Sequence, residues 1–155
     1  MLGNLSPIAI SGFWGRYAAK KSFAAMMVKC LLFLGVAQIC AFFAVPKNGV
    51  LMFSLYYLFH GAAMGGINSA LINLIFDYVD IDKRSDSLAV TQAVSGVVGF
   101  LTTLLLSPLV AKIQSNGNSV LGINLYAQQF CTMISIIFTL ILIFYIKKVI
   151  INKTV

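Results

Sequence analysis

The residues most able to do chemistry lie in the second of several long apolar segments of this chain. Tyr57, His60 and Asn68 occur there, at spacings that place them on one face of a helix. Polar and ionisable side chains are costly in hydrocarbon, so this face is a candidate functional surface. Three interpretations stay open: hydrogen bonds across helices, the lining of a water-filled substrate path, and a proton-carrying role for His60.

Small residues occupy the neighbouring arc of the same predicted helix. Gly61, Gly65 and Ser69 recur every four positions. Small side chains at this spacing let two helix backbones approach closely in a membrane. We therefore expect this arc to pack against another helix while the polar face meets something polar.

Weakly polar stripes also run along the third and fourth apolar segments. The third segment carries Gln92, Gly96, Gly99, Thr103 and Ser107, and the fourth carries Gln128, Thr132, Ser135 and Thr139. Such stripes are more typical of contacts between helices than of substrate ligands. Gln92 and Thr103 are nevertheless added to the candidates for a substrate cavity. Gln38, in the first long segment, has no polar neighbour at helical spacing and indicates nothing.

The composition points to a membrane as the main solvent. The chain has 155 residues, of which 60% are apolar or aromatic and only 10% are charged, and its mean hydropathy is +0.95. Too few polar side chains are present to cover a soluble domain, and the hydrophobicity excludes a disordered chain. The net charge of +7 comes from basic residues scattered between apolar segments, which indicates membrane topology rather than nucleic-acid binding.

No enzyme motif is evident. The chain has one histidine, no glutamate and no cysteine and histidine cluster at metal-ligand spacing. We expect neither catalysis nor a cofactor.

The apolar segments predict an all-α, polytopic membrane helix bundle forming one transmembrane domain. Helices are expected over residues 1–14 as a partial span, and over 23–45, 50–79, 81–113 and 127–148 as full spans. The first segment is too short to cross a bilayer, so the chain is expected to be truncated at its N-terminus.

Basic residues predict the orientation. They gather before the first full span, between the second and third, and after the fourth: Arg16, Lys20 and Lys21; Lys83 and Arg84; and Lys147, Lys148 and Lys153. Alternate passes place all three groups on one side, which the positive-inside rule makes cytoplasmic. We therefore expect a multi-pass protein of the cell membrane whose C-terminus is cytoplasmic.

The short link between the second and third spans holds every acidic residue of the chain. Asp80 and Asp82 stand beside Lys83 and Arg84, so these charges are expected to pair within the cytoplasmic loops. A solvated turn is the alternative, because exposed ion pairs contribute little.

Two stretches carry a family resemblance. The run PIAISGFWGRYAAKK at residues 7–21 resembles the end of helix eight and the following loop in major facilitator superfamily transporters, and residues 77–87 resemble the family's loop between helices ten and eleven. The order of loops and spans is similar to helices nine to twelve, so the resemblance covers nearly the whole chain. Gly15 and Ala18 stand where the family's loop motif has Asp and Gly, so the gating role of that Asp is not carried over.

The resemblance implies a partial C-terminal half of a major facilitator fold. The parent would be a secondary active transporter that moves a small solute by alternating access between this part and a missing N-terminal half of the same protein. Proton coupling is left open as its energy source. Its expected partners are the lipid bilayer and an unidentified small solute. The alternative is a small stand-alone membrane subunit with a structural role, for which the small-residue arcs would form the interface.

Overall fold

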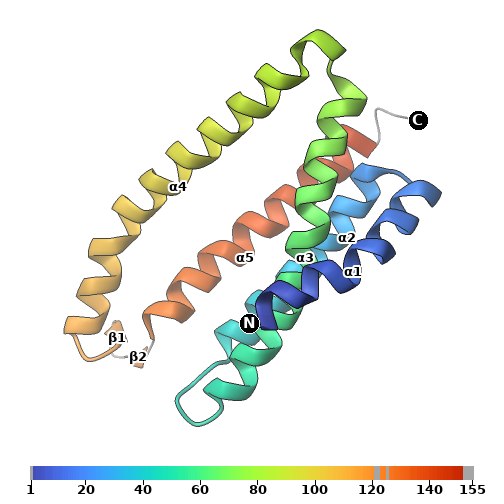
Figure 1. Ribbon diagram of the computed structural model, residues 1–155. Helices are drawn as coiled ribbons and strands as arrows, with labels where there is room; N and C mark the ends of the chain where they lie inside the picture. The colour runs from blue at the N-terminus through green and yellow to red at the C-terminus, as the bar shows by residue number, and fades with distance from the viewer. Residues whose placement is uncertain (1, 121–122, 125, 152–155) are drawn as a thin grey trace.

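The computed structural model describes residues 2–120, 123–124 and 126–151, and helices dominate it (Figure 1). The long helices are α1 (Leu2–Lys20), α2 (Phe23–Phe42), α3 (Gly49–Tyr78), α4 (Arg84–Ser115) and α5 (Ala127–Tyr145). A single 3-10 turn, η1 (Ile81–Lys83), precedes α4, and a π-helical turn, η2 (Ile146–Ile150), continues α5. The predicted helical class is confirmed at this level.

A very small hairpin joins α4 to α5. Its strands β1 (Ser119–Val120) and β2 (Ile123–Asn124) are antiparallel, with Ser119 opposite Asn124. Gly117 and Asn118, which end α4, have φ values of 67° and 59°. This left-handed backbone suits glycine and asparagine, and it turns the chain out of the helix.

Four helices of the described chain are long and apolar enough to cross a membrane. They are Phe23–Phe42, Gly49–Tyr78, Ile81–Ser115 and Ala127–Ile150. Because no lipid-exposed backbone can be left without hydrogen bonds in hydrocarbon, continuous helices are the form these segments must take. The protein is therefore a membrane-embedded helical bundle.

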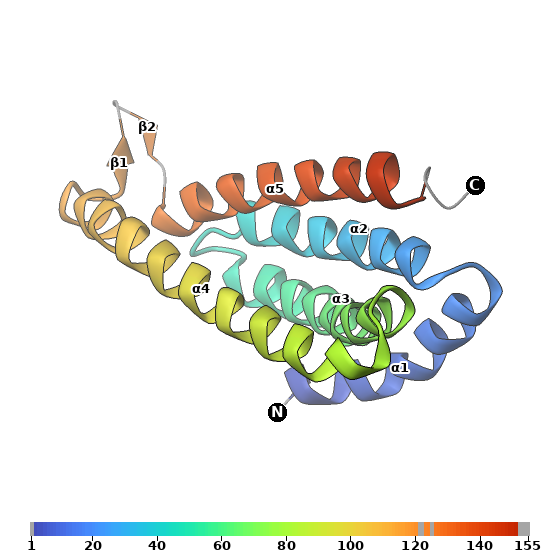
Figure 2. The same cartoon turned by 90° about the horizontal axis from the view of Figure 1, so that it is seen from above.

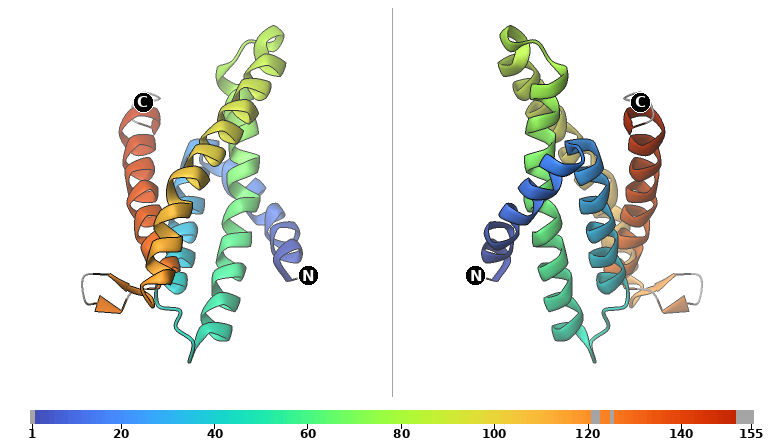
Figure 3. Two further views of the ribbon diagram at one scale, coloured as in Figure 1. Left: turned by 90° about the vertical axis from the view of Figure 1, so that its left-hand side faces the viewer. Right: turned by 90° about the vertical axis from the view of Figure 1, so that its right-hand side faces the viewer.

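The three basic groups lie at one end of the bundle. Figures 1 and 3 show the α1–α2 turn, the α3–α4 turn and the end of η2 at that end, opposite the α2–α3 loop and the hairpin. Lys21, Asp77 and Ile151 line one shared hollow there, of about 620 Å³. Lys153 lies outside the described residues. Successive helices thus run in opposite directions, as the orientation prediction requires.

The core lies among α1, α2, α3 and α5, which follow one another across the bundle in the order α5, α2, α3, α1 (Figure 2). Met26 and Cys30 of α2 are fully buried and lie in one cluster with Trp14 of α1, Ala70 of α3 and Ile146 of η2. Large side chains of α1 and α2 thus fill the space left by the small side chains of α3.

Helix α4 stands apart from this core. Ile113, near its C-terminal end, is its one buried residue in the described chain. Figures 1 and 2 show α4 leaving α3 at their shared turn and approaching α5 only near the hairpin.

One expectation about the first segment needs correction. Arg16 and Lys20 do not lie in a loop, because α1 continues to Lys20 and only Lys21 and Ser22 form the turn before α2. The helix persists because Trp14 and Ala18 are buried against the core, and tertiary packing stabilises a helix more than local propensity does. The Ser22 hydroxyl then accepts from the Ala25 amide at 3.0 Å and caps α2.

Candidate functional site

The polar face of α3 begins with an aromatic cluster. The rings of Tyr56 and His60, one helical turn apart, are stacked with centroids 5.1 Å apart and planes inclined by 30°. Tyr57 meets Tyr56 edge to face at 5.2 Å and is 57% exposed. His60 is half-buried, so its imidazole is held by the Tyr56 ring while one side stays open.

Asn68 lies two turns further along α3 and is exposed. Tyr57, His60 and Asn68 therefore share the outward side of α3, as their spacing predicted, and form a strip that follows the helix. This strip can offer an imidazole, a carboxamide and a phenol to whatever lies beside α3.

The opposite side of α3 makes a close contact with α1 and α2. A Cβ atom added at Gly66 would overlap Cys30 Sγ and would come within 3.1 Å of the Trp14 ring. Only glycine allows such an approach. Ala62 and Ala70, one turn to either side, are buried as well.

The contacts of α1 and α2 with α3 run along the Ala62, Gly66 and Ala70 line, beside the predicted packing arc. Within the arc, Gly61 is buried, Gly65 is half-buried and Ser69 is exposed, with its carbonyl accepting from Asn73 Nδ2 at 2.8 Å. Packing of another helix on Gly65 and Ser69 stays a prediction.

Trp14 fixes α1 to that line. Its indole Nε1 donates to the Ala62 carbonyl at 2.9 Å, and the side chain is 2% exposed. Sequence reasoning overlooked this anchor because Trp14 lies in a segment too short to span a membrane. The small side chains of Ala62 and Gly66 leave the Ala62 carbonyl reachable by a side chain from α1.

The candidates on α4 lie on exposed surface. Gln92 and Thr103 are both exposed, and the Thr103 hydroxyl donates to the Gly99 carbonyl of its own helix at 2.9 Å. In the described part of the chain, no hydrogen bond joins them to the α3 candidates, and α4 diverges from α3 in Figure 1. The structure therefore groups three of the five cavity candidates on α3 and leaves two on α4.

Polar contacts between helices occur where α5 meets α2. Thr139 Oγ1 lies 3.2 Å from Gln38 Oε1 and 2.8 Å from the Ser135 carbonyl of its own helix, so its one hydrogen is shared between two acceptors. The isolated Gln38 thus has a partner about a hundred positions away. Gln128 Nε2 donates to the Ala44 carbonyl and Gln129 Nε2 to the Phe42 carbonyl, each at 2.9 Å. The stripe on the fourth span signalled Gln128 and Thr139, but nothing in the sequence signalled Gln38 or Gln129.

The link between α3 and α4 is arranged differently from the predicted charge pairs. Arg84 Nη2 donates to the Phe76 carbonyl at 2.7 Å, and its Nε donates to the Val79 carbonyl at 3.1 Å. The guanidinium also lies over the Phe76 ring, 5.2 Å from its centroid. Arg84 thus binds the carbonyl end of α3, where a positive charge is favourable, instead of pairing with Asp80 or Asp82.

Asp80, Asp82 and Lys83 are exposed around this turn. Their positions fit the solvated turn that was the alternative interpretation. Among the residues that the structure describes, no group of three histidine, cysteine or acidic side chains is placed to hold a metal ion.

Comparison of the chain with protein-family models, with curated proteins and with solved structures gives no match. The arrangement of α3 and α4 therefore carries the functional argument.

Proposed function

We propose that this chain forms part of a secondary active transporter that moves a small solute across the cell membrane by alternating access. Its helices would be the last ones of a major-facilitator-type C-terminal half, and further helices would complete the solute path. The proposal assigns Tyr57, His60 and Asn68 of α3, with Gln92 and Thr103 of α4, to the wall of that path.

The division of α3 into two unlike sides carries this proposal. One side is built of Ala62, Gly66 and Ala70 and is packed against α1 and α2. The other side presents Tyr57 and Asn68 outward, although both lie in a helix apolar enough to span a membrane. Polar side chains in a span favour contact with water, solute or another helix over contact with lipid.

The exposure of α4 supports the same proposal. In the most apolar stretch of α4 no residue is buried, whereas 39% of the residues in the most apolar stretch of α2 are buried. Gln92 and Thr103 lie on this unburied helix, so additional helices could enclose a path between them and the polar side of α3. The solute itself stays unidentified, because the polar groups on both helices suit many neutral or charged compounds.

The basic groups support the orientation. Lys21, Arg84 and Lys147 belong to three segments that meet at one end of the bundle (Figure 3). By the positive-inside rule this end would face the cytoplasm, together with the C-terminus. A reporter that is active only in the cytoplasm, fused after Val155, should therefore be active; activity restricted to an exported reporter would reject the orientation.

Cysteine labelling in the intact membrane tests the solute path. Cysteines placed at His60 and Asn68 should react with a membrane-impermeant maleimide faster than cysteines placed at Phe138 and Leu140. These control positions of α5 are apolar and exposed, at 67% and 59%. Equal labelling of both pairs would reject a water-filled path along α3.

The coding region upstream of Met1 separates the transporter from the stand-alone subunit. In-frame apolar helices there would support the proposal, since alternating access needs two halves. A stop codon directly before Met1 would favour a small structural subunit whose α4 packs against a partner. Proton coupling is a separate question, tested by whether a His60→Gln variant abolishes proton movement with the solute.

A further inference from the structure

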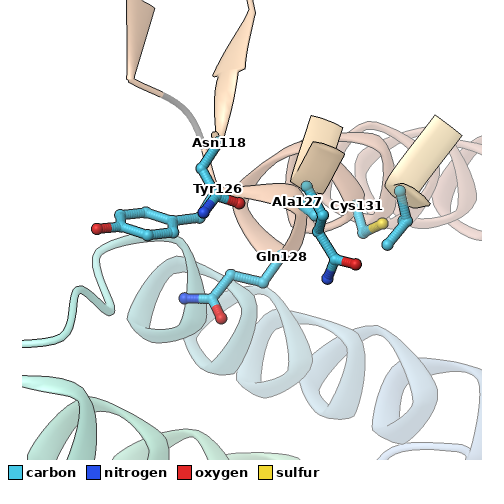
Figure 4. A pocket seen from close by; sticks show the side chains of 7 residues that line it. Asn118, Tyr126, Ala127, Gln128 and Cys131 are labelled. Carbon is cyan, nitrogen blue, oxygen red and sulfur yellow. The ribbon is translucent and has the colours of Figure 1, made fainter. Parts of the chain in front are cut away.

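A hollow of mixed polar and apolar lining lies at the end of the bundle opposite the basic groups. Its volume is about 510 Å³, within the range of small-molecule sites. It lies between the last turns of α4 and the first turns of α5, and Figure 4 shows it from close by. Its lining consists of Val110, Gln114, Asn118, Tyr126, Ala127, Gln128 and Cys131.

Three residues with carboxamide side chains line this hollow, from three parts of the chain. Gln114 comes from α4, Asn118 from the turn that follows it, and Gln128 from α5. Each carboxamide offers both donors and an acceptor. In the described part of the chain, no hydrogen bond engages the side chains of Gln114 and Asn118 or the Oε1 atom of Gln128.

The backbone holds two of these groups in place. Asn118 donates its amide to the Ile113 carbonyl at 3.0 Å and has φ 59°, which fixes the turn that presents its side chain. Gln128 Nε2 is held by the Ala44 carbonyl at 2.9 Å. Its other amide atom, Oε1, is thereby set in a fixed direction. Such fixed groups lose little conformational entropy when a ligand binds.

None of the described residues that line the hollow is charged. Lys112, the basic residue nearest in sequence to Gln114, is not part of it, since two helical positions turn it to another side of α4. An ion would therefore lose hydration here without gaining an opposite charge. Val110, Ala127 and Cys131 add an apolar wall against which carbon atoms can lie.

We propose that this hollow binds an uncharged, hydroxyl-rich small molecule of about monosaccharide size. Hydroxyl groups both donate and accept, which matches carboxamides, and the carbon skeleton would lie on the apolar wall. The site shares no residue with the polar side of α3, so it does not depend on the proposed transport function.

Cys131 supplies a native reporter for this site. In the wild-type chain purified in lipid nanodiscs, N-ethylmaleimide labelling of each cysteine is followed by mass spectrometry of peptides. Glucose, glycerol and sucrose are the neutral probes, and gluconate and glucosamine are charged analogues of glucose. At a neutral-probe concentration ten times its Kd, labelling of Cys131 should be about tenfold slower.

Cys40 and Cys30 are internal controls in the same sample. Cys40 is half-buried on α2 and should keep its rate, while the buried Cys30 should stay unreactive as long as the bundle is folded. An unchanged Cys131 rate with all three neutral probes would overturn the proposal. Equal protection by gluconate or glucosamine, or parallel slowing at Cys40, would also overturn it.

Two variants test the assigned residues. Asn118→Gly removes a carboxamide at a backbone position that glycine adopts without strain, and Gln114→Leu changes an exposed side chain. Each should abolish most of the protection while Cys30 stays unreactive. The matched control, Asn116→Gly, changes an exposed residue outside the hollow and should keep full protection. Protection that survives both Asn118→Gly and Gln114→Leu would reject the site.

Discussion

Helices α2 and α4 have similar hydropathy but differ in how far they are buried. Both are long and strongly apolar, with mean hydropathies of 2.0 and 1.9 over their most apolar stretches. Yet α2 buries eight residues among α1, α3 and α5, whereas α4 buries only Ile113 in the described chain. In a bilayer, apolar character decides whether a helix enters the membrane, and shape together with polar contacts decides which helices then pack.

The sharpest test of this contrast compares glycines. Gly66→Ala places a methyl group against Cys30 Sγ and the Trp14 ring, and overpacking of this kind costs about 1–3 kcal/mol. Gly96→Ala on α4 meets nothing within 4 Å and should be neutral or slightly stabilising. Equilibrium unfolding in mixed detergent micelles measures both. Equal stability of the two variants would contradict the close approach at Gly66.

The indole anchor should give the next largest effect. Trp14→Phe removes the indole hydrogen bond to the Ala62 carbonyl, which lies inside α3 and keeps its helical partner, so the expected cost is about 0.5–1.5 kcal/mol. Phe13→Leu, one residue earlier but 53% exposed, should change stability little. The same unfolding measurement applies. A larger loss for Phe13→Leu than for Trp14→Phe would mean that α1 packs through another face.

A smaller effect is expected for the polar pair between α2 and α5. A double-mutant cycle of Gln38→Leu and Thr139→Val should give a coupling of about 0.6 kcal/mol, the average for hydrogen bonds between membrane helices. Thr102→Val on α4 is the control, because its hydroxyl bonds only to the Val98 carbonyl of the same helix. Gln38→Leu combined with Thr102→Val should be additive, and coupling there would point to an indirect effect.

The smallest effect is predicted for the outer surface of α4. Leu104→Ala and Leu105→Ala alter side chains that are 59% and 69% exposed, so they leave no cavity. Each should change stability by less than about 0.5 kcal/mol, as surface substitutions do. A loss as large as that of Gly66→Ala would show that α4 is covered in the protein tested. In this chain alone, the small change is expected. In the full-length transporter proposed above, a large loss is expected at positions of α4 that face the added helices.

The sequence was a good guide wherever a property depends on composition along the chain. Long uncharged stretches located the four spans, and basic residues located the end of the bundle that holds Lys21 and Arg84. The polar strip on α3 followed from helical period alone, because His60 and Asn68 are eight positions apart.

Contacts between helices that are far apart in the sequence could not be predicted from it. Gln38 has no local feature that points to Thr139, and Arg84 was expected to pair with a carboxylate because the competing carbonyls of Phe76 and Val79 are not visible in a sequence. The line of α3 that α1 and α2 approach was equally hard to choose, since Gly65 and Gly66 are equally small. The positions of Trp14 and Cys30 put the close contact at Gly66.

The bonds from Gln128 and Gln129 to Ala44 and Phe42 bear on how the protein is made. The last carbonyl groups of a helix have no partner within it. Here the carbonyl of Phe42, the last residue of α2, and the carbonyl of Ala44, just beyond the helix, are both bonded by α5. Those two residues of α5 are translated more than eighty codons after the carbonyls that they bond. During synthesis the end of α2 therefore lacks these two donors until α5 has been made and has packed beside it.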